Sequence, residues 1–446
     1  MKKIFFITAC FLALSGATGQ VPYQAVPEGF GAAATGGGST APVIVSDFAS
    51  LRTNLTAAGA RVILVSGVIT IPAGQQINAV ISNKSLIGLA GARLVNENQT
   101  GSGIINLRNG SNNIIIRNLI FVGPGAYDTN GADNLTNQGG TNIWIDHCEF
   151  QDGQDGNLDN VGQSDNITIS WCKFTYLKPP VPGGSGGSND HRFSNLVGSS
   201  ASDKPADGHY SITFQSCYWA EGSRERMPRA RNAELHILNS YYNTSVAGSV
   251  GIGLGGGINN STAFVENTHF ARISSYFKNY VSTDGGSIAV NYSNSLTGTA
   301  PVPASMNIGS VSPPNYIYTV MPVAEVATYV PDPTCGAGAT LQVTAEAVIS
   351  PGQCSNMGTG TNIKRDGIKL YPVPVKDILN IEFPVGKSST TLLEIYAADG
   401  RKVFTSSALN VSGSRMNVNI AHLPKGSYFG RLQQGDKSYP LKFTKE

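Results

Sequence analysis

One eight-residue pattern recurs six times between residues 114 and 270, and it limits what this chain can fold into. In each copy the first and third positions are apolar or alanine, and the eighth position is aromatic. The starts of the copies lie 29, 24, 45, 23 and 28 residues apart, and repeats of this length are typical of a solenoid. The copies are Ile114–Phe121, Ile143–Phe150, Ile167–Phe174, Ile212–Trp219, Leu235–Tyr242 and Ala263–Phe270.

Each copy has the side-chain period of a strand with one buried face. Apolar residues alternate with residues such as Asp146, Thr168 and Gln215. One repeat cannot enclose a core, so equivalent strands must stack in parallel, about 4.8 Å apart. The fifth position is Asn or His in four copies, and amide side chains stacked at a bend can bond to one another and to the turn backbone. We predict an all-β, right-handed parallel β-helix; the alternative, a leucine-rich repeat, lacks its LxxLxL pattern here.

The N-terminus has the features of a secretory signal peptide. Met1–Gly19 begins with two lysines, continues with an apolar run and ends in small residues, so we expect cleavage near Gly19. No other stretch is apolar for long enough to span a bilayer. The net charge of +2 and the lack of a basic run give no reason to expect nucleic acid or a membrane surface as a partner.

The cysteines form two groups. Cys335 and Cys354 flank a short segment outside the repeats and could pair, because export permits disulfides. Cys10 leaves with the signal peptide, and the other three share one column of the repeat, where the spacing between rungs lies at the lower edge of disulfide geometry. We expect these to be free, buried thiols, with a disulfide between rungs as the alternative: Cys148, Cys172 and Cys217.

Composition changes after about residue 340, where we expect a second domain. Residues 341–366 form a linker, and residues 367–446 read as short strands with hairpin signals such as Lys425-Gly426. The segments LYPVPVKDILNI and NIAHLPKGSYFGRL resemble the β-sandwich sorting domain of type IX secretion cargo. That resemblance implies export by the type IX machinery, to the exterior or the cell surface. A small carbohydrate-binding or Ig-like sandwich is the alternative. The predicted β-helix domain is residues 20–340.

Three aspartates lie at the entrances of neighbouring turns. Asp133 precedes Trp144 by eleven residues, and Asp155 and Asp159 occur together in the sequence DGNLD. On stacked rungs these side chains can converge, and three hard oxygen ligands in a loop-rich patch suit calcium. The alternative is that the aspartates cap turns.

An arginine cluster follows downstream. Four cations on one short turn repel one another unless they meet an anionic partner, and arginine pairs bidentately with carboxylates and phosphates. We therefore expect a polyanionic ligand, although pairing with Glu221 and Glu225 on a solvated turn is the alternative. The four are Arg224, Arg226, Arg229 and Arg231.

These motifs together resemble the pectate lyases of polysaccharide lyase family 1. The sequences IWIDH at Ile143–His147 and RMPRAR at Arg226–Arg231 are similar to the WIDH box and the RxPxxR box of that family. The resemblance covers roughly Glu28–Ala339. It implies β-elimination on polygalacturonate or pectin with Ca²⁺ as cofactor, and we expect a secreted monomer.

The resemblance also implies a role for each residue. Arg226 matches the arginine credited with removing the C5 proton of a galacturonate, and Arg231 matches a partner that binds substrate and supports the site. Asp146 and His147 match a pair that we expect to be structural. The calcium-binding acids would be Asp133, Asp155 and Asp159, and further substrate-binding residues would be Arg229, Arg192 and Arg224.

Three positions depart from the family pattern. Gly131 stands where a further carboxylate is common, and Val161 and Phe193 stand where lysines are common, which leaves Arg192 as the cation of its segment.

Because three acids remain, pectate is favoured over methylated pectin, the substrate of calcium-independent pectin lyases. A polygalacturonase on the same solenoid would need two carboxylates flanking the bond, and a non-catalytic adhesin would use the arginines only to bind a glycan. The glycine motif Gly251–Gly256 satisfies GxGxxG, but no helix is expected to follow it, so we set a dinucleotide site aside.

Overall fold

The computed structural model describes residues 23–127 and 133–354, and residues 369–446 apart from short gaps at 373, 383–389, 398–400, 407–408, 411–414 and 435–436. The predicted signal peptide, Gly131 and residues 355–366 of the predicted linker lie outside the described residues.

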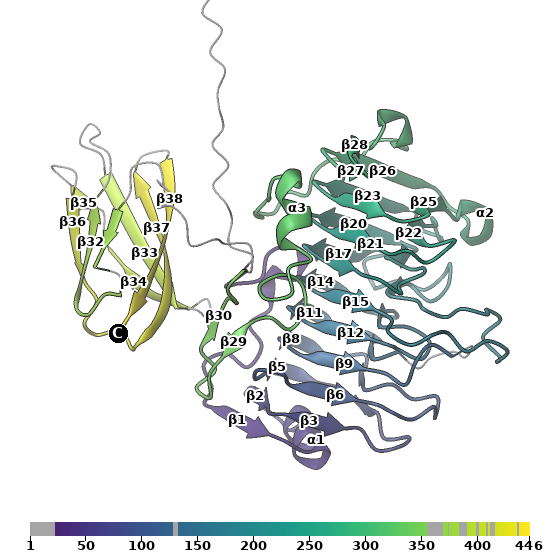
Figure 1. Ribbon diagram of the computed structural model, residues 1–446, viewed down its shortest axis with the longest axis horizontal. Coiled ribbons are helices and arrows are strands. Elements are labelled where there is room, and N and C mark those ends of the chain that lie inside the picture. Colours follow the sequence, from purple (N-terminus) through teal and green to yellow (C-terminus); the bar gives the residue numbers. More distant parts are fainter. Residues whose placement is uncertain are drawn as a thin grey trace, which may run out of the picture.

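The larger part of the chain is a parallel β-helix whose rungs stack in three sheets (Figure 1). All but one of the strand pairings within these sheets are parallel, since only the terminal β27–β28 pair is antiparallel. Sheet 1 contains β1 (Pro42–Val45), β2 (Arg61–Val65), β5 (Ser82–Gly88), β8 (Asn112–Arg117), β11 (Thr141–Asp146), β14 (Asp165–Ser170), β17 (Tyr210–Gln215), β20 (Ala233–Leu238), β23 (Ser261–Glu266) and β26 (Ile288–Ser293).

Sheets 2 and 3 complete each rung. Sheet 2 contains β3 (Val68–Thr70), β6 (Arg93–Val95), β9 (Ile120–Val122), β12 (Glu149–Gln151), β15 (Lys173–Thr175), β18 (Tyr218–Trp219), β21 (Tyr241–Asn243), β24 (His269–Arg272), β27 (Leu296–Thr297) and β28 (Ala300–Pro301). Sheet 3 contains β4 (Ile77–Ala79), β7 (Ile105–Leu107), β10 (Leu135–Asn137), β13 (Leu158–Asn160), β16 (Leu196–Val197), β19 (Arg229–Ala230), β22 (Val250–Leu254) and β25 (Ser275–Asn279).

The predicted bend at the fifth position of the repeat is confirmed, and it divides each copy into two strands. The residue there has a left-handed backbone in all six copies, with φ between 43° and 55°. Asn tolerates this conformation best, because its short side chain bonds locally. The chain therefore turns from sheet 1 into sheet 2 at Asn118, His147, Trp171, Ser216, Asn239 and Asn267.

The eighth position of the repeat builds an aromatic stack through the core. Neighbouring rings lie 4.5 to 5.8 Å apart between centroids and are nearly parallel, and all of these side chains are buried. Offset stacking of this kind stabilises beyond the area that is buried. The column thiols Cys148, Cys172 and Cys217 are free and buried, as predicted. The stack consists of Phe121, Phe150, Phe174, Trp219, Tyr242 and Phe270.

Asparagines of the bend column bind the segment that follows the last rung. The amide of Asn239 accepts a hydrogen bond from the Met321 N–H at 2.7 Å and donates to the Met321 carbonyl at 2.5 Å. Asn118 accepts from the Leu341 N–H at 2.9 Å and donates to the Leu341 carbonyl at 3.0 Å. Residues between Met321 and Leu341, which include α3 (Val323–Tyr329), are thereby attached to the side of the solenoid.

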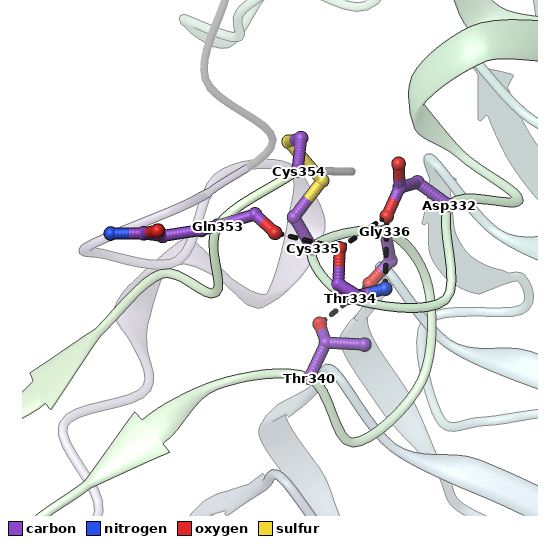
Figure 2. The surroundings of a disulfide bond; sticks show 7 residues. All are labelled: Asp332, Thr334, Cys335, Gly336, Thr340, Gln353 and Cys354. Carbon is purple, nitrogen blue, oxygen red and sulfur yellow. Dashed lines mark hydrogen bonds between the residues drawn. A yellow bond between two sulfur atoms is a disulfide. The ribbon is translucent and has the colours of Figure 1, made fainter. Parts of the chain in front are cut away.

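A disulfide joins Cys335 to Cys354 (Figure 2), so the predicted pairing is confirmed. Beside it, the Thr334 hydroxyl donates to the Gln353 carbonyl at 2.6 Å. The hairpin of β29 (Gln342–Val343) and β30 (Ile349–Ser350) lies within the loop that the bridge closes. The remaining helices of this part are η1 (Phe30–Ala33), α1 (Phe48–Thr56), α2 (Val281–Asp284) and η2 (Ala304–Met306).

The C-terminal residues form two antiparallel sheets around a separate core, which confirms the predicted β-sandwich. One sheet contains β31 (Lys369–Tyr371), β32 (Ile378–Glu382) and β36 (Arg415–Asn419). The other contains β33 (Thr390–Ala397), β34 (Lys402–Thr405), β35 (Leu409–Asn410), β37 (Gly426–Gln434) and β38 (Lys437–Lys445). Over the described residues, no helix combines the length and apolar character that crossing a membrane requires.

Candidate active site

The predicted acids and arginines gather along sheet 3. Asp159 lies in β13, Asp133 directly precedes β10, and Arg229 lies in β19. The strand order β10, β13, β16 and β19 places these residues on neighbouring rungs. Residues 177–208, which lie between the third and fourth copies of the repeat, supply β16 between the acids and the arginines, so this segment contributes a rung to the site itself.

Asp133 is a buried carboxylate with one satisfied oxygen. Its residue is 3% exposed, and the Thr136 hydroxyl donates to Oδ2 at 3.0 Å. Oδ1 is buried and has no hydrogen-bond partner among the described residues. Burial raises the pKa of Asp133 well above its usual range, and the charges of Asp159 and Asp155 raise it further. The ionised form of Asp133 is therefore disfavoured unless a cation binds beside it.

Asp159 links the acids to the arginines. The Leu196 N–H donates to Asp159 Oδ1 at 2.9 Å, and Arg226 Nη1 lies 4.0 Å from Oδ2. Burial raises the pKa of Asp159 to about 7; Arg226 and the Leu196 N–H oppose this increase, and Asp155 adds to it. Asp155 takes a different contact, since its Oδ1 lies 3.1 Å from Nδ1 of His191.

Two of the three predicted metal ligands face one small space. A Cβ atom built on Gly156 would lie 2.6 Å from Asp133 Oδ1 and 3.3 Å from Asp159 Oδ1, so only a residue without a side chain leaves this space open. Two buried carboxylates that repel each other fit a divalent cation with oxygen ligands. No group of three or more His, Cys, Asp or Glu in the described ranges is arranged to hold a metal ion. Asp155 contacts His191 and also interacts electrostatically with Asp133 and Asp159.

Arg226 has a conformation of its own within the cluster. Its backbone is left-handed, with φ of 60°, and its guanidinium carbon lies over the Phe193 ring, 4.2 Å from the ring centre. Its carbonyl accepts a hydrogen bond from the Asn195 N–H at 2.6 Å. The side chain is 22% exposed, and its one described ion pair is the contact of 4.0 Å with Asp159. Arg226 is therefore accessible to a ligand and only weakly paired.

Arg229 and Arg231 share a carboxylate that sequence reasoning missed. Arg229 Nη2 donates to both oxygens of Asp284, at 2.8 and 3.0 Å. Arg231 Nε lies 3.1 Å from Asp284 Oδ1, although its N–H is not directed at that oxygen, so this contact is an ion pair without a hydrogen bond. Arg231 Nη1 donates to the Gly198 carbonyl at 2.8 Å. Burial lowers the pKa of Arg231, and the charge of Arg229 lowers it further, while Asp284 opposes both.

The two outer arginines are also paired. Arg192 makes a bidentate pair with Asp190, with distances of 2.8 and 2.6 Å, and Arg224 Nη1 lies 3.2 Å from Glu225 Oε1. The predicted pairing with glutamates thus holds for Glu225, whereas Glu221 accepts from Ser245. Asp190 is a second acid that the motif spacing did not indicate.

Asp146 makes the contacts expected of a structural residue. It is fully buried, accepts from Arg117 Nε at 2.9 Å and from the Ser170 hydroxyl at 2.7 Å, and lies 2.8 Å from Nδ1 of His147. Burial opposes its ionisation, but the charges of His147 and Arg117 outweigh burial and keep its pKa below the usual value.

Comparison with known sequences separates the chain into two matched parts. Residues 369–446 match the family model of the secretion system C-terminal sorting domain, which confirms the predicted sorting domain and an exported protein. The pectate trisaccharide-lyases of Thermotoga sp. strain RQ2 and Thermotoga maritima are each 33% identical over 243 residues. The alignments cover 52% of this chain and 59% and 58% of those relatives, so the chain spans less than two thirds of their length.

Solved structures share the β-helix fold. Pectate lyase Bsp165PelA from Bacillus sp. N165, in complex with trigalacturonate, matches with a TM-score of 0.50 and 22% identity over 68% of this chain and 96% of its own. The pectate lyase pelN from Paenibacillus sp. 0602 matches with a TM-score of 0.54 and 18% identity over 71% and 96%. Residues 7–338, about three quarters of the chain, match the family model described as pectate lyase. The chain therefore belongs to the pectate lyase family.

Proposed function

We propose that this protein is an exported, calcium-dependent lyase that cleaves polygalacturonate by β-elimination. One observation carries the proposal: an accessible, weakly paired Arg226 lies 4.0 Å from Asp159, which shares a small space with the buried Asp133. An anionic sugar chain bound there would meet a cation site and a guanidinium together.

The reaction begins at the C5 proton of a galacturonate. In our proposal, Arg226 removes this proton, the bond from C4 to the glycosidic oxygen breaks, a C4–C5 double bond forms, and the leaving oxygen takes up a proton. Loss of the C5 proton drives negative charge onto the neighbouring sugar carboxylate. When bound at Asp133 and Asp159, calcium would stabilise this charge as a Lewis acid.

A guanidinium must lose its proton before it can act as a base, and its ordinary pKa is above about 12. Neighbouring positive charges favour the neutral form. Arg231 interacts electrostatically with Arg226 and with Arg229, so the cluster supplies such charges. We propose that Arg231 also binds the substrate carboxylate, and that Arg192, Arg224 and Arg229 bind it with their remaining donors.

The predicted domain division also belongs to this proposal. Residues 20–340 would be the catalytic solenoid, residues 341–366 the linker, and residues 367–446 the part that the type IX secretion machinery recognises. We propose that the mature enzyme acts as a monomer, with Asp155 as a third, adaptable calcium ligand.

The test is an absorbance assay with the purified protein on low-methyl and high-methyl pectin, with and without a chelator. Unsaturated chain ends absorb ultraviolet light. We expect absorbance to rise fastest on low-methyl pectin with calcium and to stop with chelator. Chelator-resistant activity on high-methyl pectin would identify a pectin lyase instead. New reducing ends without absorbance would identify a polygalacturonase, and binding without cleavage would identify an adhesin.

A further inference from the structure

We propose that Asp284 is a positioning residue for the arginine pair Arg229 and Arg231. It reaches this pair past Gly253 and Gly255 of the rung that lies between them. The inference rests on the proposed lyase function. It also gives a structural role to the glycine motif Gly251–Gly256.

The three rungs involved are consecutive in sheet 3. Arg229 of β19 is in register with Gly253 of β22, and Gly253 is in register with Lys278 of β25. Past the strands, the Asn232 N–H donates to the Gly256 carbonyl, and the Gly256 N–H donates to the Gly285 carbonyl at 3.0 Å. Asp284 therefore lies two rungs from the arginines it binds, with the glycine rung between them.

Space for these contacts exists because the middle rung has glycine at positions 253 and 255. A Cβ atom on Gly255 would lie 2.1 Å from Asp284 Oδ2, and one on Gly253 would lie 2.7 Å from the Tyr280 ring. Neither glycine has a positive φ, so the requirement is for room and not for backbone conformation. A side chain at Gly255 would push the carboxylate away from its partners.

Tyr280 adds a second contact to the same pair. The guanidinium carbon of Arg229 lies 3.7 Å from the centre of the Tyr280 ring, a cation–π geometry. Tyr280 also anchors α2, because its carbonyl accepts a hydrogen bond from the Asp284 N–H at 2.9 Å. Arg229 is thus held between a ring and a carboxylate that belong to one short segment.

The charge of Asp284 matters as much as its position. Its side chain is 7% exposed, and those of Arg229 and Arg231 are 18% and 13% exposed, so solvent screens the three charges poorly. Together, the two guanidiniums and the Asp284 carboxylate have a net charge of +1. Removing that negative charge leaves two poorly screened guanidiniums side by side, and their repulsion would move them from the positions that Asp284 holds.

The decisive variant is Asp284→Asn in the full-length protein, which keeps the shape and removes the charge. We expect kcat/KM on polygalacturonate with calcium to fall by about 10²-fold, the loss typical of misplaced catalytic groups. We also expect KM for polygalacturonate to rise, because Arg229 and Arg231 are proposed to bind the substrate carboxylate. A merely structural role would lower the amount of folded enzyme, and with it kcat, and would leave KM unchanged.

Two further variants keep the test falsifiable. Gly255→Ala displaces the carboxylate while keeping its charge, so it should also lower kcat/KM and raise KM. It decides the question if Asp284→Asn fails to fold. Glu149→Gln is the matched control, because Glu149 pairs with Lys173 at 3.1 Å in sheet 2 and should keep full activity.

The outcomes separate the inference from the proposed function. An inactive wild-type protein overturns the lyase function. An active wild type whose Asp284→Asn and Gly255→Ala variants are equally active overturns the role of Asp284 alone. Reduced activity with an unchanged KM in Asp284→Asn also overturns it.

Discussion

Arg226 rests on the face of Phe193, with 4.2 Å between the guanidinium carbon and the ring centre. The backbone below the ring is fixed, because the Tyr176 hydroxyl donates to the Phe193 carbonyl at 2.6 Å and Phe193 forms a parallel bridge with Glu225. A cation over an aromatic face gains about 0.5 to 2 kcal/mol. The Phe193 ring therefore holds the guanidinium of the proposed base in place.

Phe193→Leu should weaken this orientation while preserving an apolar side chain. We expect kcat to fall by about 3- to 30-fold, which corresponds to the cation–π energy, with a smaller change in KM. Steady-state kinetics on polygalacturonate will measure both values. An unchanged kcat would mean that the ring does not orient Arg226.

Arg226→Ala should remove the proposed base. General bases contribute about 10²- to 10⁴-fold to rate, and we expect a loss of that size in the absorbance assay. Arg226→Lys keeps a cation at the position and tests whether charge alone is sufficient. Circular dichroism must show that each variant is folded, because residue 226 has a left-handed backbone. Wild-type activity in Arg226→Ala would refute the assignment.

Calcium should stabilise the folded protein independently of activity. A ligand at 100 times its Kd adds about 2.7 kcal/mol to the unfolding free energy, so Tm should rise with calcium. Asp133→Asn should abolish that increase. Without calcium the same variant should be more stable than wild type, because it removes a carboxylate whose ionised form is disfavoured by burial and by the charges of Asp159 and Asp155. Calorimetry with and without a chelator measures both effects, and an equal rise in Tm for the variant would contradict them.

The disulfide should stabilise the segment that closes the solenoid. Cys335 and Cys354 are 19 residues apart, and a loop of this size predicts a loss of about 3 kcal/mol when the bond is removed. The double variant Cys335→Ser/Cys354→Ser should therefore unfold at lower denaturant concentration. Reductant should weaken the wild type and leave the double variant unchanged; sensitivity of both would point to a different target.

The buried Asp146 should make stability depend on acid pH. Asp146→Asn removes the charge that faces the buried Arg117, and breaking a buried pair costs about 3 to 5 kcal/mol. The pKa of Asp146 is lowered in the folded state, so its stabilisation is present above the unfolded value of 3.8 and is lost as pH falls through the lower folded value. The stability gap between wild type and variant should narrow below pH 3.8. Denaturant unfolding at neutral and acid pH tests this, and a constant gap would contradict it.

The repeat made the fold predictable, because its period and its fifth position determine both the strands and the bend. The division of each copy into two strands was missed, since a left-handed residue such as Trp171 carries no signal in its side chain. The acids and arginines of the site were found through their motifs. Asp284 lies 55 residues from Arg229. Their contact could not be predicted from spacing in the sequence, because it forms only when three rungs stack. The sequence also does not show why β22 needs its glycines, because the side chains for which they leave room, Tyr280 and Asp284, belong to a later turn.

Two asparagines of the bend also hold the segment that follows the last rung. Asn118 binds Leu341 from 223 residues away, Asn239 binds Met321, and the disulfide between Cys335 and Cys354 attaches the last described residue before the sorting domain. We therefore expect that a maturation protease cutting beyond Cys354 would remove the sorting domain and leave each of these attachments intact.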